Sequence, residues 1–160
     1  MVVLVVAAVA IALMTCALLV RPLTWGENGE LDLTIALDAP SMPPNGSIGC
    51  RYTLTNVGDT DLRILPPWDL VLSIIGPDNR TLQYTGAVPM LRPYEDDDLV
   101  TLRPGQSWHM DLTISASNWD LRANETYGVR AVYEMGEQSS VRLPYWQGEV
   151  WSDTVPFSVM

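Results

Sequence analysis

Apolar and polar residues alternate along much of the chain after residue 30, and the alternation is clearest in two stretches. Between Trp108 and Ile114 every second residue is apolar, while intervening residues such as His109 and Asp111 are polar. Residues 127–134 repeat the pattern. Because successive side chains of a β-strand point to opposite faces, each stretch predicts a strand with one buried face. We expect these two strands to form the centre of the core.

With weaker versions of this alternation, separated by turn-forming residues, the chain has nine candidate ranges for about eight short strands. Including the two stretches above, they are residues 31–37, 48–54, 62–64, 68–75, 81–84, 99–102, 108–114, 127–135 and 155–159. Residues 40–46 and the long connection 136–148 are predicted loops, and no helical periodicity follows residue 20. The pattern is typical of an all-β protein. We expect an immunoglobulin-like antiparallel β-sandwich of about 7–8 strands over residues 30–160.

The N-terminal part of the chain has a different pattern, because residues 2–20 contain no charge. At about 1.5 Å per residue, a helix of this length reaches about 28 Å, the thickness of a bilayer's hydrocarbon core. We expect one transmembrane helix over residues 1–20 and a juxtamembrane linker over residues 21–29, with Trp25 at the membrane interface. A signal peptide, uncleaved or cleaved, is the alternative, although no basic residue precedes the apolar run. A start site further upstream is also open.

Charge and sequons bear on partners and location. The net charge is −10, which argues against nucleic acid as a partner, because phosphate binding needs a basic stripe. Asn45, Asn79 and Asn124 each begin an Asn-x-Ser/Thr sequon in a predicted turn and are glycosylation candidates. Together with the apolar N-terminus, they favour a domain anchored through residues 2–20 and lying outside the cytoplasm at the cell surface.

Few residues suit catalysis or ligand binding. His109 is the only histidine, and the alternation points it towards solvent, so it cannot alone build a zinc site or a catalytic triad. Cys50 has the parity of a small core residue, and a disulfide with Cys16 is not expected. One acidic run is a weak candidate for calcium, with a solvated loop as the alternative. It consists of Glu95, Asp96, Asp97 and Asp98. We expect no cofactor and no enzymatic activity.

Several aromatic residues lie in or beside predicted loops and are candidates for contact with a partner. They are Trp119, Tyr145, Trp146 and Trp151. Exposed aromatic side chains with nearby proline and glycine often form recognition surfaces. The alternative is that these rings cover the open end of the sandwich.

Four segments of the domain resemble a known group. They are RYTLTNVGDTDLRIL, LQYTGAVPMLRPYEDDDLVTLRPGQSWHMDLTISASNWDL, TYGVRAVYE and GEVWSDTVPFSV. They resemble the immunoglobulin-like domain that precedes the catalytic domain of aspzincin (deuterolysin-like) metallopeptidases and, more loosely, intracellular proteinase inhibitors and surface accessory domains. Aspzincins need a His-Glu-x-x-His helix and a downstream aspartate. This chain has one histidine, so the resemblance implies a fold without the catalytic domain.

These observations lead to one main functional hypothesis and two alternatives. The main hypothesis is a membrane-anchored extracytoplasmic domain without enzymatic activity, which acts in protein–protein contact or as a structural part of an envelope assembly. Its free sheet edges and residues 145–151 are the expected contact regions. One alternative is a protease inhibitor or regulator that uses the loop at residues 85–93. The other is a pilin-like filament subunit.

Overall fold

The computed structural model describes residues 30–68, 71–88 and 90–160. The described chain is mostly β-structure. The predicted transmembrane helix at 1–20, the linker at 21–29 and Trp25 lie outside the described residues, so the anchor stays a prediction. Within the described ranges, no helix is long and apolar enough to cross a membrane.

The first sheet contains three antiparallel strands in the order β1–β3–β7. They are β1 (Leu31–Leu37), β3 (Ser47–Asn56) and β7 (Ser107–Ser115). Each was predicted from period-two alternation. The central strand β3 places Tyr52 opposite Ile35 on one side and Met110 on the other.

The second sheet is built on β8 (Glu125–Met135), the longest strand. β5 (Leu72–Ile75) pairs with one edge of β8, while β10 (Val155–Val159) and β9 (Gly148–Trp151) pair with its N- and C-terminal parts. β2 (Ser41–Met42) adds to β10 in parallel, which corrects the all-antiparallel expectation.

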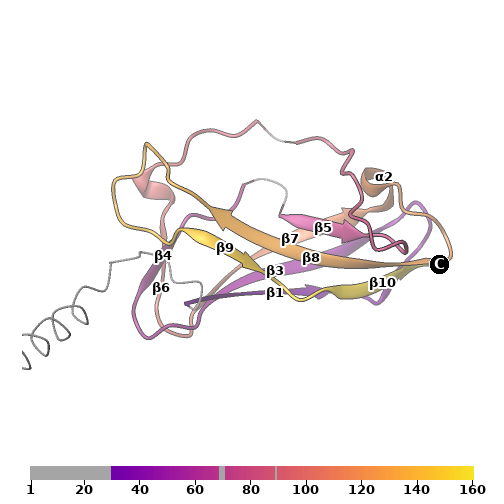
Figure 1. The fold of residues 1–160 in the computed structure, drawn as a ribbon, viewed down its shortest axis with the longest axis horizontal. Helices are drawn as coiled ribbons and strands as arrows, with labels where there is room; N and C mark the ends of the chain where they lie inside the picture. The colour runs from indigo at the N-terminus through magenta and orange to yellow at the C-terminus, as the bar shows by residue number, and fades with distance from the viewer. Residues whose placement is uncertain (1–29, 69–70, 89) are drawn as a thin grey trace, which may run out of the picture.

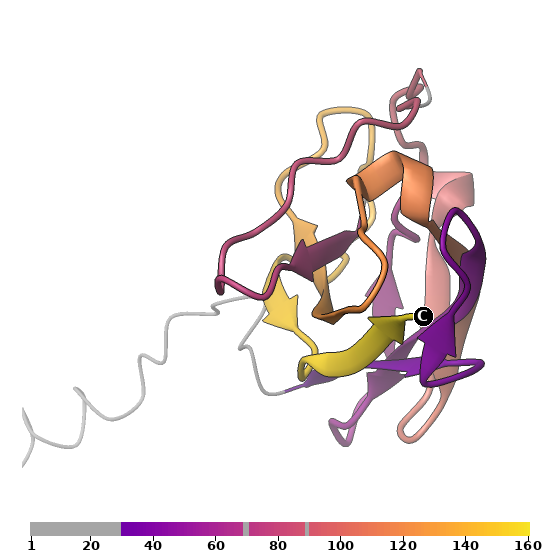
Figure 2. The ribbon, with the colours of Figure 1, turned by 90° about the vertical axis from the view of Figure 1, so that its right-hand side faces the viewer.

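A third, two-stranded sheet joins β4 (Leu62–Ile64) to β6 (Val100–Leu102) at the end of the molecule farther from the C-terminus (Figure 1). Two short helical turns accompany the sheets: the 3₁₀ helix η1 (Asp96–Asp98) and α2 (Ala116–Trp119). Figure 2 shows the molecule from the end where the C-terminus lies, with α2 nearby.

Both larger sheets supply buried side chains to one core. Tyr52 and Leu54 from β3 and Val129 and Tyr133 from β8 are completely buried, and β1 contacts β8 across the core. Every second side chain of β8 from Tyr127 onward is buried, as the alternation predicted. This burial is the main source of stability, at about 25 cal/mol per Å² of apolar surface.

The predicted core strand β7 is less buried than expected. Ile114 is fully buried, but Trp108, Met110 and Leu112 are only partly buried although they point to the core face. The reason is position, because β7 is an edge strand and pairs only with β3 within the described part of the chain.

Other differences concern elements too short to show periodicity. β2 has two residues and lies in a predicted loop, and β9 falls at the end of the predicted connection 136–148. α2 is a single turn that the sequence did not predict. The strand predicted at 81–84 is reduced to one bridge between Thr81 and Ile75. Periodicity needs several residues to be visible, and single bridges depend on tertiary contacts.

Candidate functional site

Carboxylates of the acidic run accept hydrogen bonds from backbone N–H groups of the protein. The Oδ2 atom of Asp98 accepts a hydrogen bond from the backbone N–H of Glu95 at 2.8 Å. The Oδ1 atom of Asp96 accepts hydrogen bonds from the backbone N–H groups of Arg142 and Leu143, at 2.7 and 3.2 Å. Asp98 therefore bonds to the start of its own helical turn, whereas Asp96 bonds to the distant backbone of residues 142–143. Across the described ranges, no cluster of three or more His, Cys, Asp or Glu side chains is arranged for a metal ion.

The same run fixes Arg92 in a defined position. Two guanidinium N–H groups of Arg92 donate to the two carboxylate oxygens of Asp98, at 3.0 and 2.5 Å. The guanidinium carbon also lies 4.3 Å from the centroid of the Trp68 ring. A bidentate pair and a stacked aromatic ring each fix the plane of a guanidinium group, which lysine could not reproduce. The hydrogen bond from Arg92 holds the pKa of Asp98 below its ordinary value.

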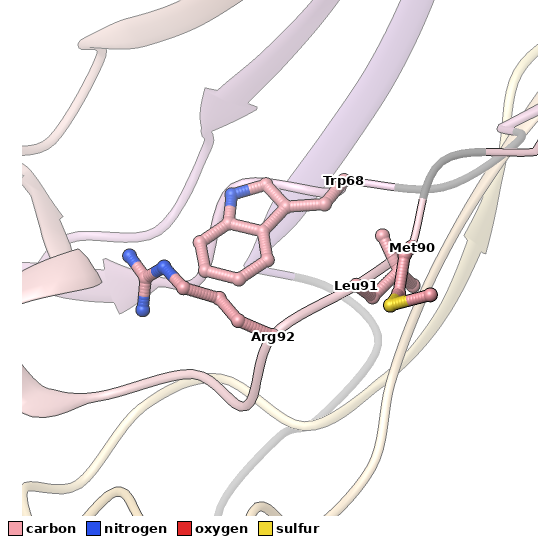
Figure 3. A pocket seen from close by; sticks show the side chains of 4 residues that line it. All are labelled: Trp68, Met90, Leu91 and Arg92. Carbon is pink, nitrogen blue, oxygen red and sulfur yellow. The ribbon is translucent and has the colours of Figure 1, made fainter.

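The ring of Tyr94 packs against the ring of Trp68. The two ring centroids are 4.2 Å apart, and the Tyr94 hydroxyl donates to the backbone carbonyl of Pro66 at 2.8 Å. Trp68, Met90, Leu91 and Arg92 line an open hollow of about 340 Å³ (Figure 3). We call the surface formed by these four residues the loop surface.

The loop surface exposes apolar side chains. Met90 is 100 % exposed and Leu91 46 %. Leu143 is also 46 % exposed, and its backbone is tied to η1 through Asp96. Scattered apolar residues are normal on a protein surface, but a group beside a preorganised Trp–Arg pair is typical of a contact site.

Three of the four predicted contact aromatics are instead buried, which corrects that prediction. Trp119, Tyr145 and Trp146 are only 4 %, 7 % and 2 % exposed. Trp119 packs 5.0 Å from Tyr84, and Trp146 stacks 5.1 Å from Tyr133. Their flat rings cover apolar core that the strands leave open, which is the alternative considered from the sequence.

Trp151 is the exception, at 43 % exposure. The guanidinium carbon of Arg130 lies 4.4 Å from the centroid of the Trp151 ring, and the indole N–H donates to Glu149 at 2.5 Å. Trp151 therefore stays a contact candidate on the outer face of β9.

The remaining candidates lie as the sequence indicated. His109 is exposed, and Cys50 is 1 % exposed with burial raising the pKa of its thiol to about 11. The sequon residues Asn45, Asn79 and Asn124 are exposed and all have positive φ, between 58° and 63°. Asparagine adopts this left-handed conformation more readily than most residues, so turn geometry alone explains its presence at the three positions.

Sequence reasoning missed Trp68 and Arg92. Trp68 was assigned to a strand because alternating apolar residues follow it, and Arg92 was treated as part of an irregular loop. A signal was present, because Met90 and Leu91 form an apolar pair in a proline-containing loop where no alternation explains them. The six-residue interval between Arg92 and Asp98 gave no indication of their pairing.

Comparisons with known proteins give little further information. No family model and no curated protein matches the chain. Among solved structures, it is similar to the sporulation control protein Spo0M from Bacillus subtilis, with 15 % identity and a TM-score of 0.43 over 82 % of this chain. The match covers 51 % of Spo0M, so the chain spans about half the length of that protein. A likeness this low supports no argument about function.

Proposed function

We propose that the chain is a membrane-anchored, extracytoplasmic domain without enzymatic activity, which acts by protein–protein contact through the loop surface. The observation that carries the proposal is the pair of exposed apolar side chains, Met90 and Leu91, beside the fixed Trp68–Arg92 pair. The anchor at residues 2–20 and the extracytoplasmic location rest on the sequence.

We further propose that the domain is an immunoglobulin-like β-sandwich. Two mainly antiparallel sheets that share one core support this proposal. The long connections between β5 and η1 and between β8 and β9 are then insertions between strands of the sandwich. Loops carried on a rigid β scaffold are a common location for binding residues.

The chemistry of the loop surface favours a protein partner. Trp, Arg and Met are enriched at protein interfaces, where they bury large areas. Arg92 is already oriented by Asp98 and Trp68, so little side-chain entropy remains to be lost on binding. The hollow is open and shallow, which fits a protruding side chain of a partner better than an enclosed small molecule.

Site-specific photo-crosslinking in intact cells of the source organism tests the contact. A photoreactive residue at Met90 should give a discrete adduct with one partner, while the same residue at Val57, which is 55 % exposed on another part of the molecule, should not. The Met90 adduct should weaken strongly when Leu91→Asp or Arg92→Gln is added. Equal adducts at both positions, or an adduct insensitive to these changes, would contradict the proposal.

Cell fractionation tests the anchor separately. The full chain should stay in the membrane pellet after alkaline extraction, and a chain lacking residues 2–20 should be released. Recovery of the full chain in the soluble fraction would show that the apolar segment is removed or does not span the bilayer.

Protease inhibition is a second candidate, favoured by the way the loop around Met90 is held. The Thr85 backbone N–H and hydroxyl donate to the carbonyl of Asn118 at 2.8 and 3.0 Å, and Arg92 is held by Asp98. An exposed loop with fixed ends is what an inhibitor needs to occupy a protease active site. A panel of peptidases from the source organism tests this, and absence of inhibition across the panel would exclude it. The filament-subunit alternative depends on residues 1–29, which lie outside the described part.

A further inference from the structure

The nine-residue strand β7 has one unpaired edge. It pairs with β3 along its whole length, and within the described residues no strand pairs with its other side. An edge strand presents a row of free N–H and C=O groups that can pair with another chain, and proteins usually block such edges. β7 contains no proline and no lysine, and its outer side chains alternate regularly.

Two hydrogen bonds at the ends of β7 show which backbone groups face outward. The N–H of Asn56 donates to the carbonyl of Gln106, and the N–H of Ala116 donates to the carbonyl of Gly46, both at 3.0 Å. Hydrogen-bonding direction alternates along an antiparallel strand, so even-numbered residues of β7 bond to β3. Odd-numbered residues, including His109 and Asp111, therefore point their N–H and C=O groups away from the sheet.

The core face of β7 is also incomplete. Trp108, Met110 and Leu112 point to the core side yet are only partly buried. Each would bury more apolar surface if the sheet continued beyond β7. The edge and the half-covered face belong to the same nine residues.

We propose that a second copy of this chain pairs with β7 in antiparallel orientation, with Met110 opposite Met110 of the second copy. This register places His109 opposite Asp111 twice, once on each side of the two-fold axis. It brings outward-facing backbone groups of both strands together, and it lets each His109 side chain hydrogen-bond to the Asp111 carboxylate directly across the antiparallel pair. The neighbouring registers in each direction place His109 opposite His109 or Asp111 opposite Asp111.

The pairing would extend the three-stranded sheet to six strands. On the core side, Trp108 would lie opposite Leu112 of the second copy and the two Met110 side chains would meet. On the solvent side, Asp111 would keep its bidentate contacts with Arg51, at 2.8 and 3.2 Å, and gain a histidine from the other chain. The proposal does not depend on the loop surface, whose residues lie outside β7.

Disulfide trapping of the full chain in its membrane fraction tests both the pairing and its register, in a Cys16→Ser background that leaves only buried Cys50. In the proposed register the two Met110 Cα atoms face each other about 4.5 Å apart, within the range for a disulfide. Met110→Cys should form a covalent dimer under mild oxidation. Leu112→Cys is the matched control on the same face. It should not form a covalent dimer, because in this register residue 112 of one copy lies about four residues along the strand from residue 112 of the other.

A second pair of variants tests the proposed contact between His109 and Asp111 without new cysteines. His109→Asp places like charges at both cross-strand contacts and should weaken self-association about tenfold in sedimentation of the detergent-solubilised full chain. Thr34→Asp adds a carboxylate to the exposed face of β1 at the far edge of the same sheet and should leave association unchanged. A monomeric wild-type chain, trapping at Leu112→Cys, or trapping to a different protein would overturn the proposal.

Discussion

Among the residues that the structure describes, Asn56 is the one asparagine with a fully buried side chain, and it joins two turns. Its side-chain N–H groups donate to the carbonyls of Thr60 and Leu102, both at 2.8 Å, and its Oδ1 atom accepts from the N–H of Gly58 at 3.0 Å. A buried amide is tolerated only when its polar atoms are paired. Here the pairing fixes the end of β3 to the end of β6.

Asn56→Ala should therefore destabilise the domain strongly. The change removes three hydrogen bonds, one buried and two partly buried, so the free energy of unfolding should fall by about 3 kcal/mol. Urea denaturation of the full chain measures this. Asn118→Ala is the control, because the Asn118 side chain accepts only a 3.5 Å hydrogen bond at the surface, and a similar loss there would contradict the assignment.

Asp98 gives a pH-dependent prediction. Because Arg92 lowers its folded-state pKa below the ordinary 3.8, the pair is stabilising above that value and the contribution disappears as pH falls through the lowered pKa. Carboxyl NMR should show the Asp98 midpoint below 3.8. In Arg92→Gln the midpoint should move up, while the Asp111 midpoint, lowered by Arg51, stays in place. An unchanged Asp98 midpoint would contradict the pairing of Arg92 with Asp98.

At the scale of elements, β9 and β10 pair with the same edge of β8 through a bulge. Trp151 lies opposite Val132 and Val155 lies opposite Val129, so residues 152–154 face only two residues of β8. The hydroxyl of Ser152 fills the gap, because it accepts a hydrogen bond from the N–H of Ala131 at 2.8 Å. A bulge of this kind increases local twist and redirects the strand without ending the pairing.

Ser152→Ala should weaken this junction. The N–H of Ala131 would be buried without a partner, which costs about 1–3 kcal/mol. Hydrogen exchange should report faster exchange of the Ala131 amide, and urea denaturation should show the loss of stability. Ser158→Ala on β10 removes only an exposed contact with Thr126 and is the matched control. Equal effects of the two changes would show that the hydroxyl is not needed for the bulge.

At the scale of the whole molecule, the two sheets are joined through one apolar core, and Cys50 reports on its opening. The thiol is 1 % exposed, and burial raises its pKa to about 11, so little thiolate forms at neutral pH. A thiol reagent reaches such a group mainly when the core opens.

In the Cys16→Ser chain, Cys50 should react with a thiol reagent at pH 8 more than about a thousandfold more slowly when folded than in urea. Thr34→Cys in the same background places a thiol on the exposed face of β1 and should react quickly in the folded chain. Comparable rates for folded and unfolded Cys50 would contradict the buried position. The measurement is spectrophotometric.

Some features of the fold were predictable from the chain and others were not. Strands β1, β3, β7 and β8 were predicted because seven or more residues alternate in each. The exposure of His109 and the burial of Cys50 followed from the same parity. The sequence left open whether Trp119 and Trp146 contact a partner or cover the end of the sandwich, because loop aromatics carry no periodic signal of their environment. Loop residue Arg92 was missed for the same reason.

The sequence by itself determined which strands have an apolar face, where the chain turns, and that residues 2–20 contain no charge. These properties are local, because alternation and turn formation depend on neighbouring residues. Only the tertiary structure decided which strand lies at an edge, which loop aromatics the core takes up, and that Arg92 meets both Trp68 and Asp98. Those outcomes depend on the order of strands in the sheets and on contacts between distant residues. The free edge of β7 and the loop surface, on which both proposals rest, are products of that arrangement.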